Sequence, residues 1–176
     1  LRNEGPLSKA DITRILKLSF PAVSSNVDYL IKKNYIREVG EGNNVMGRKS
    51  TLLEFNAKYG YVIGIDLGRS LIRLKVSDLM GNSVDTFTSY VKRRNNGNNL
   101  VKQLNMLIDE AIAKCNISMS DIMCVGVGTP GILDRETGKI IVAPYATGWS
   151  DINIIGIFDG IFDCPVVFEN SVNLGA

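Results

Sequence analysis

The stretch GIDLGRS, residues 64–70, holds the residue types and the spacing best suited to chemistry. A short apolar strand runs into Asp66, and Gly68 then lets the backbone turn tightly before Ser70. This turn offers a carboxylate, a glycine backbone without a side chain, and a hydroxyl. Such groups suit a loop that lies against phosphate or a sugar hydroxyl. The alternative is a purely structural role, in which Asp66 only caps the end of its strand.

The composition is that of an ordinary globular protein of one domain or two small ones. Hydrophobic residues make up 45% and charged residues 22% of the 176 residues. No apolar run approaches the roughly 18 to 20 residues of a membrane span, and no signal peptide is visible. We therefore expect a cytoplasmic protein with no membrane partner. Because the sequence lacks an initiator Met, we also expect that residues are missing from its front.

The sequence has no histidine, so the usual zinc ligand set and the usual general base are absent. The three cysteines, Cys115, Cys124 and Cys164, share no CxxC spacing, and buried thiols in a reducing compartment are the best interpretation. A metal held by three thiolates is the alternative, and their spacing does not favour it. We expect no metal and no cofactor in this chain.

The first third of the chain carries the excess of positive charge. Residues 1–57 hold nine Lys and Arg against six Asp and Glu, which hints at a surface that faces phosphate. Ser8 followed by Asp11 predicts a capping box at the start of a first helix. The apolar face of that helix would consist of Ile12, Ile15 and Leu16.

A second helix is predicted after a break at KLS, residues 17–19. Pro21 suits its first turn, where the missing N–H costs nothing. Its apolar stripe would be Val23, Val27, Leu30 and Ile31. Two short helices joined by a tight turn predict a helix-turn-helix.

Two extended segments, YIREVG and TLLEF, then flank the basic loop EGNNVMGRKS. A hairpin with a basic tip behind a helix-turn-helix predicts a winged helix-turn-helix DNA-binding domain over residues 1–57. The candidate DNA contacts are Ser19 just before the second helix, Phe20, Ser24, Ser25 and Lys32 on it, and Gly47, Arg48 and Lys49 in the wing. Taken singly, the helices could serve only for packing and the loop could be a solvated surface. The alternative for Ser24 and Ser25 is that they are ordinary helix-surface residues.

Residues 58–176 predict one lobe of an actin-like, ribonuclease H-like sugar-kinase ATPase fold, so that the whole chain is of the α+β or α/β class. Three antiparallel strands are expected in YVIGIDLG, LIRLKVSD and SVDTFTSYV, then a helix over residues 100–115. A buried strand in IMCVGVGTPG, a small hairpin in DRETGKIIVAP and a last strand in CPVVFEN would complete it.

The whole chain resembles the transcriptional-repressor branch of the ROK family, which comprises repressors, uncharacterised reading frames and sugar kinases. The motifs that carry the resemblance are GRKS, GYVIGIDLGRS, VGVGTPGILD, APYATGW and FENSVNLGA, in family order. Any one of these motifs is weak, but five in order are strong. The resemblance implies that a sugar-kinase-like domain follows a DNA-binding domain, so that a sugar controls DNA binding.

The departures from the family pattern concern catalysis. The resemblance implies that ROK kinases carry, as third residue of a Glu-Asn-Asp motif, the Asp that takes the proton from the sugar hydroxyl; Ser171 stands there. A serine with a pKa far above 7 and no neighbouring histidine cannot be that base. Tyr145 replaces the usual Asn, and Arg69 and Ser70 replace the usual Gly and Thr, whereas Asp66 and Gly68 are kept. We expect a sensor with no catalytic residue.

By the same resemblance, Gly131, Asn170 and Ser171 are the candidate sugar-binding residues. An ordinary turn at Gly131 and a buried amide at Asn170 that ties the strand end to the next helix are the alternatives. Asp66, Gly68 and Ser70 are the remnant of the phosphate loop, in which Asp66 would orient a metal–nucleotide complex in a kinase. Trp149 could stack on a sugar, but a lone Trp is more often core.

The resemblance implies that family members continue for about as many residues again, with a second lobe, a zinc-binding Cys/His cluster and most of the dimer contacts. We expect this chain to be a fragment or a truncated gene product, and the full-length protein to be a homodimer or homotetramer. The expected function is a repressor that binds double-stranded operator DNA and a small sugar effector. Xylose or another aldose ranks first, because xylose-type repressors of the family also alter the position of Ser171. An active ATP-dependent sugar kinase and a DNA-binding remnant without ligand are the alternatives.

Overall fold

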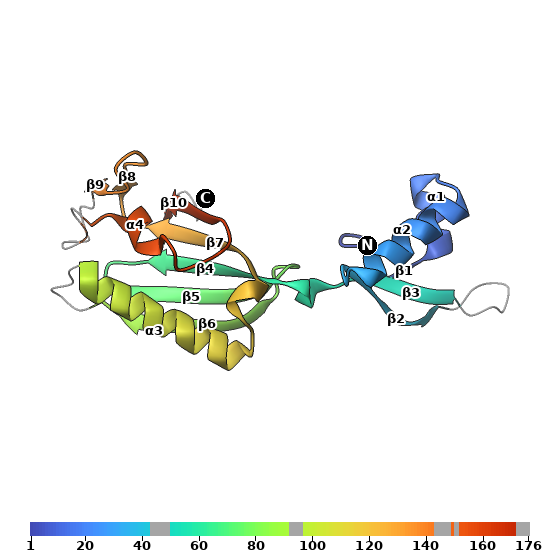
Figure 1. The fold of residues 1–176 in the computed structure, drawn as a ribbon, viewed down its shortest axis with the longest axis horizontal. Helices are drawn as coiled ribbons and strands as arrows, with labels where there is room; N and C mark the ends of the chain where they lie inside the picture. The colour runs from blue at the N-terminus through green and yellow to red at the C-terminus, as the bar shows by residue number, and fades with distance from the viewer. Residues whose placement is uncertain (43–49, 92–96, 143–148, 150–151, 172–176) are drawn as a thin grey trace. The chain divides into compact units, whose positions relative to one another are not determined.

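The computed structural model describes residues 1–42, 50–91, 97–142, 149 and 152–171. These residues form two compact units, Leu1–Tyr59 and Gly60–Ala176 (Figure 1). The boundary expected after residue 57 falls inside a short 3-10 helix, Ala57–Tyr59.

The first unit consists of two helices and a small antiparallel sheet. Its elements are β1 (Leu7–Ser8), α1 (Lys9–Leu16), α2 (Phe20–Lys32), β2 (Ile36–Gly42) and β3 (Ser50–Phe55). The strand order is β1-β3-β2, with every pair antiparallel. The two helices and the two strands that follow them were predicted, whereas β1, only two residues long, was not.

The capping box at the start of α1 is confirmed. The amide of Asp11 donates to Oγ of Ser8 over 3.1 Å, and the amide of Ser8 donates back to Oδ2 of Asp11 over 3.1 Å. The hydroxyl of Ser8 also donates to this carboxylate, and these bonds hold the pKa of Asp11 below its ordinary value. The helix ends where Lys17 adopts a left-handed conformation with φ of 55°.

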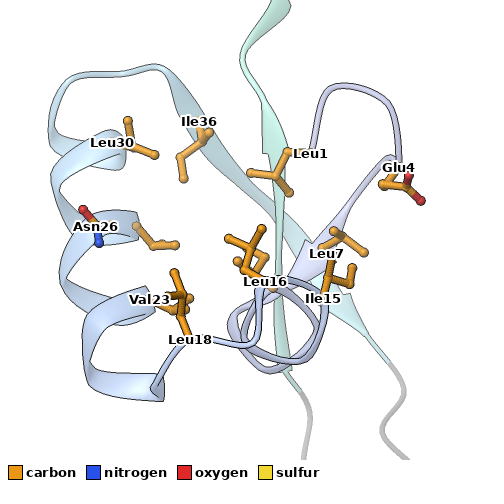
Figure 2. A pocket seen from close by; sticks show the side chains of 12 residues that line it. Leu1, Glu4, Leu7, Ile15, Leu16, Leu18, Val23, Asn26, Leu30 and Ile36 are labelled. Carbon is orange, nitrogen blue, oxygen red and sulfur yellow. The ribbon is translucent and has the colours of Figure 1, made fainter.

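The core of the first unit is small and lies between α2 and the sheet. Its buried members are Val23, Val27, Ile36 and Leu53. Ile15 and Leu16, predicted for the apolar face of α1, are instead 51% and 57% exposed. They line an apolar groove of about 510 Å³ between the two helices, together with Leu18, Val23 and Leu30 (Figure 2). No described residue fills this groove.

The second unit is built on a mixed five-stranded sheet with strand order β10-β7-β4-β5-β6. Strands β4 (Tyr61–Leu67), β5 (Leu71–Asp78) and β6 (Ser83–Tyr90) form an antiparallel meander. Strands β7 (Ile122–Thr129) and β10 (Val166–Asn170) run parallel to β4. All five strands were predicted from their apolar alternation and turn residues.

Helix α3 (Gly97–Cys115) lies along β5 and β6 (Figure 1) and buries its apolar stripe against the sheet. Leu104 and Ile108 of the helix meet alternate strand residues such as Ile65 and Leu74 in one core. Each such fully buried side chain contributes about 1.5–3 kcal/mol of transfer free energy. Trp149 is 3% exposed within this core, so its role is packing and not sugar stacking.

A 3-10 helix (Met119–Asp121) joins α3 to β7. The elements between β7 and β10 are the small hairpin of β8 (Ile132–Leu133) and β9 (Ile140–Val142), and the short helix α4 (Ile154–Phe158). The sequence predicted the hairpin but not α4, whose start is capped by Asn153 accepting a 2.9 Å bond from the amide of Gly156. Among the described helices, none has the length and the apolarity that a membrane crossing requires.

Candidate functional site

A polar cluster lies where three parallel strands of the second unit end. The register of the sheet sets Asp66 of β4 beside Gly128 of β7, and Gly128 beside Glu169 of β10. Ser171 follows directly after β10. Because parallel strands place their carboxyl ends at one edge, residues more than 100 positions apart meet there.

Ser171 is the best-defined member of this strand-end cluster. Its Oγ lies 3.1 Å from Oδ1 of Asp66 and 3.2 Å from the carbonyl oxygen of Thr129. Both neighbours are acceptors, so the single hydroxyl proton of Ser171 points into the cluster and is donated. The side chain that stands at the position of the expected proton acceptor therefore acts as a donor.

Asp66 is engaged through both carboxylate oxygens. Oδ1 accepts from Ser171, and Oδ2 lies 3.4 Å from the guanidinium of Arg73, its cross-strand partner on β5. The side chain of Asp66 is 43% exposed, so it also remains open to solvent. Its predicted role as an orienting group for a metal–nucleotide complex is not tested by these contacts. Arg73 was not singled out in the sequence, although its place opposite Asp66 follows from the register once β4 and β5 pair.

The phosphate-loop remnant is a tight turn between β4 and β5. The amide of Gly68 donates to the carbonyl of Leu71 over 3.0 Å, and a Cβ at Gly68 would lie 2.6 Å from that oxygen. The carbonyl of Ser70 accepts from the amide of Val91 over 3.0 Å. Ser70 is exposed, and its hydroxyl role in binding phosphate stays a prediction.

Gly131 and Asn170 meet through one hydrogen bond. The side-chain amide of Asn170 donates to the carbonyl oxygen of Gly131, which has a left-handed φ of 87°. This contact ties the end of β10 to the turn after β7, a structural role close to the alternative considered for Asn170. Binding of sugar by either residue is still a prediction.

Glu169 and Arg135 form an ion pair of 3.2 Å beside the cluster. Arg135 lies in the turn between β8 and β9 and also donates to the carbonyl of Phe168 over 3.4 Å. The other carboxylate oxygen of Glu169 accepts from the amide of Asn170 over 2.8 Å. Sequence reasoning missed Arg135, because nothing in the spacing links residues 34 positions apart.

The predicted DNA-contacting residues on α2 are exposed, apart from Ser24, which is half-buried. Phe20, Ser25 and Lys32 have exposed side chains, and Phe20 is 53% exposed. Ser19 is exposed at the N-cap of α2, where its side chain makes no capping bond. Gly47, Arg48 and Lys49 of the predicted wing lie outside the described residues.

Ser24 has a second role within the first unit. Its Oγ lies 3.0 Å from Nζ of Lys9, and the same ammonium forms a 2.6 Å ion pair with Asp28. These bonds join the start of α1 to the middle of α2. A contact of Ser24 with a DNA base stays a prediction.

The three cysteines are unpaired thiols and partly buried, not fully buried as expected. Burial raises the pKa of the thiols of Cys115 and Cys164. Among the described residues, no group of three or more His, Cys, Asp or Glu side chains could hold a metal ion. The zinc-binding cluster implied by the family resemblance was expected outside this chain, so it stays a prediction.

The mixed sheet of the second unit, covered by α3, has the strand order expected for the sugar-kinase-like fold. A family profile described as the ROK family matches residues 62–176, and the chain belongs to that family. It is 31% identical over 170 residues to the xylose repressor of Caldicellulosiruptor bescii, covering 97% of this chain and 42% of the relative. The chain thus spans less than half the length of this curated relative.

Two solved structures share the fold. One is a ROK family transcriptional regulator that is a homologue of the Escherichia coli Mlc protein, with a TM-score of 0.61, 18% identity, and coverage of 96% of this chain and 42% of the other. The second is a ROK family glucokinase from Streptomyces griseus in complex with glucose and AMPPNP, with a TM-score of 0.51. That match has 23% identity and covers 63% of this chain and 33% of the kinase. The predicted sugar-kinase-like fold of the second unit is thereby confirmed.

Proposed function

We propose that this chain acts in a sugar-responsive transcriptional repressor. Its first unit would bind operator DNA, and its second unit would sense a sugar without phosphorylating it. The likeness to the xylose repressor over 97% of the chain supports this proposal and ranks xylose or another aldose first.

The observation that carries the proposal is the contact between Ser171 and Asp66. In a ROK kinase, the family resemblance places a catalytic carboxylate at the position of Ser171. Here a hydroxyl stands there and donates its proton to Asp66 over 3.1 Å, and the chain has no histidine that could take over as base. Loss of a positioned general base removes about 10²- to 10⁴-fold of rate. Donors and acceptors for sugar hydroxyls remain, so sugar occupancy would be the signal.

The first unit supports the DNA-binding half of the proposal. The order of α1, turn, α2, β2 and β3 supports the expected winged helix, in which α2 would be the helix for the major groove. Phe20, Ser25 and Lys32 would face the DNA from α2, with Gly47, Arg48 and Lys49 in the wing. The bonds of Lys9 to Ser24 and Asp28 link α1 to α2.

Sugar would act by favouring one state of the protein over another. A ligand shifts such an equilibrium only by its difference in affinity for the two states. A coupling of about 1–3 kcal/mol corresponds to a change of about 5- to 150-fold in operator affinity.

The proposal is tested by selecting duplexes that the full-length protein binds from a random pool, then titrating the best one by fluorescence anisotropy with and without each sugar. We expect at least one aldose to change the Kd about 5-fold or more. Failure to bind any duplex, or a Kd that no bound sugar alters, would contradict the proposal.

An active sugar kinase is the second candidate, since Asp66 and Gly68 of the phosphate loop are kept and the fold is shared with a glucokinase. Sugar-dependent release of ADP separates it from the sensor, because only the kinase consumes ATP.

A further inference from the structure

We propose that two copies of this chain pair through the exposed flank of α3, about a two-fold axis that passes beside Met106. This self-association goes beyond the proposed function and does not depend on it. It uses one surface of the second unit, the α3–β6 edge, which we define by Thr88 and Ser89 of β6 and by Lys102, Gln103, Met106 and Glu110 of α3.

The first observation is the unusual exposure of one apolar side chain at this edge. Met106 is 74% exposed, the second highest value after Tyr90 among the large hydrophobic side chains that the structure describes. The Tyr90 side chain belongs to the other face of β6, because it follows Ser89, whose hydroxyl meets Gln103 of α3. An exposed apolar side chain within a polar rim is typical of a protein contact.

The second observation is a groove beside Met106. It has a volume of about 590 Å³ and runs between α3 and β6, with Leu107 among its lining residues. Strand β6 is the last strand of the five-stranded sheet, so no described strand covers its outer side. The bonds from Gln103 to Ser89 and Tyr90 hold the strand end and the helix together and keep the groove in shape.

The third observation identifies the partner as a second copy. Lys102 and Glu110 lie four residues before and four residues after Met106, so they share its helical face at equal distances. When two such helices pack antiparallel about a two-fold axis at Met106, Lys102 of each copy faces the partner's Glu110. The helix face then carries a cation, an apolar side chain and an anion in a row that is complementary to a second copy of itself. An isologous contact requires this self-complementarity. An unrelated partner would not need this symmetry.

The intrahelical pair of Glu110 with Lys114, at 2.6 Å, is compatible with this arrangement. Both of its side chains are about half exposed, so Glu110 keeps an open side for a second cation. Lys102 forms no described ion pair and is exposed, which leaves its ammonium available to the partner.

The first experiment measures the dimer dissociation constant of the 176-residue chain by sedimentation equilibrium. Met106→Asp places two carboxylates against each other at the axis and should raise the Kd at least ~10-fold. Met119→Asp changes a Met that is 38% exposed outside the groove and should leave the Kd within roughly 2-fold. Circular dichroism shows whether each variant is folded. A wild-type chain that stays monomeric, or a dimer that Met106→Asp leaves intact, overturns the proposal.

A charge exchange tests the pairing directly and does not rely on Met106. Lys102→Glu alone sets like charges against the partner's Glu110 twice per dimer and should weaken association, more strongly at low salt. Adding Glu110→Lys restores opposite charges across the axis and should recover most of the affinity, although it removes the Lys114 pair within the helix. A double variant no tighter than Lys102→Glu overturns the proposal.

Discussion

The hydroxyl of Ser171 donates to Oδ1 of Asp66 over 3.1 Å, although 105 residues separate the two in the chain. The bond joins the end of β10 to the end of β4 across the intervening strand β7. A general base must accept the proton of the sugar hydroxyl, whereas Ser171 donates its own proton. The same contact therefore stabilises the sheet edge and supports the proposal of a sensor.

Replacing Ser171 by Asp should make the stability of the protein depend on pH. The new carboxylate would stand beside Asp66, and like-charge repulsion raises the pKa of the introduced carboxyl above its value in the unfolded chain. The folded variant then holds a proton that the unfolded chain releases, so its free energy of unfolding falls as pH rises from about 4 to 7. Urea denaturation across this range measures the effect.

Ser171→Asn is the matched control, because the amide is similar in size and uncharged. It should show the pH dependence of the wild-type chain. Equal pH profiles for Ser171→Asp and Ser171→Asn would mean that residue 171 does not face Asp66.

Gly68→Ala should destabilise the second unit because the turn after β4 has no room for a side chain. The added Cβ would meet the carbonyl oxygen of Leu71 at 2.6 Å, so the backbone must shift. We expect a loss of about 1–3 kcal/mol in the free energy of unfolding. Gly64→Ala, within β4 itself, meets no atom within 4 Å and should change stability by less than about 0.5 kcal/mol. A smaller loss for Gly68→Ala than for Gly64→Ala contradicts the tight turn.

Ser8→Ala should lower the stability of the first unit by about 1 kcal/mol, since it removes the cap of α1. The hydrogen bonds from Ser8 also lower the folded pKa of Asp11. Their contribution is therefore complete above the unfolded pKa of about 4 and is lost as pH falls through the lower folded pKa. Asp11→Asn should remove the share of the acid dependence that comes from Asp11, as measured by thermal melting of the helical signal at pH 2 to 6. Asp78, Asp121 and Asp134, whose pKa values also lie below the ordinary value, should keep their own share. A variant that keeps the wild-type acid dependence would rule out the capping box as its source.

Much of the architecture follows from the sequence, because the signals for it are local. Alternation of apolar residues predicts β4, and helical spacing of Leu100, Leu104 and Ile108 predicts α3. The capping residues of α1 are equally local. The short helix α4 was missed, since five residues of IIGIF show no period that separates a helix from a buried strand.

The candidate site could be predicted only in part. Asp66 and Ser171 were found through motif types and family resemblance, but their mutual contact depends on the parallel register of three strands. Arg73 reaches the cluster through the pairing of β4 with β5, and its place follows only once their register is known. Arg135 reaches it from a turn, and no spacing in the sequence indicates that contact. On α1, periodicity predicted burial of Ile15 and Leu16, yet both are more than half exposed because no described residue covers their groove.

Arg48→Ala should weaken DNA binding and reduce its dependence on salt, if the predicted wing contacts phosphate. Losing one phosphate contact lowers the slope of log K against log salt by about 1. Lys75→Ala, which removes an exposed charge from β5, serves as the control and should leave the slope unchanged. An unaltered slope for Arg48→Ala would remove Arg48 from the interface.

The most direct test of the central claim is a coupled assay of ADP release by the full-length protein, with ATP and a panel of hexoses, pentoses and N-acetylhexosamines. Sugar binding is followed in parallel by calorimetry. Phosphoryl transfer would require a base at residue 171, where Ser171 instead donates a hydrogen bond to Asp66. We therefore predict that a sugar binds and that no sugar increases ADP release above the background. Brisk, sugar-dependent turnover that yields sugar phosphate would contradict the account.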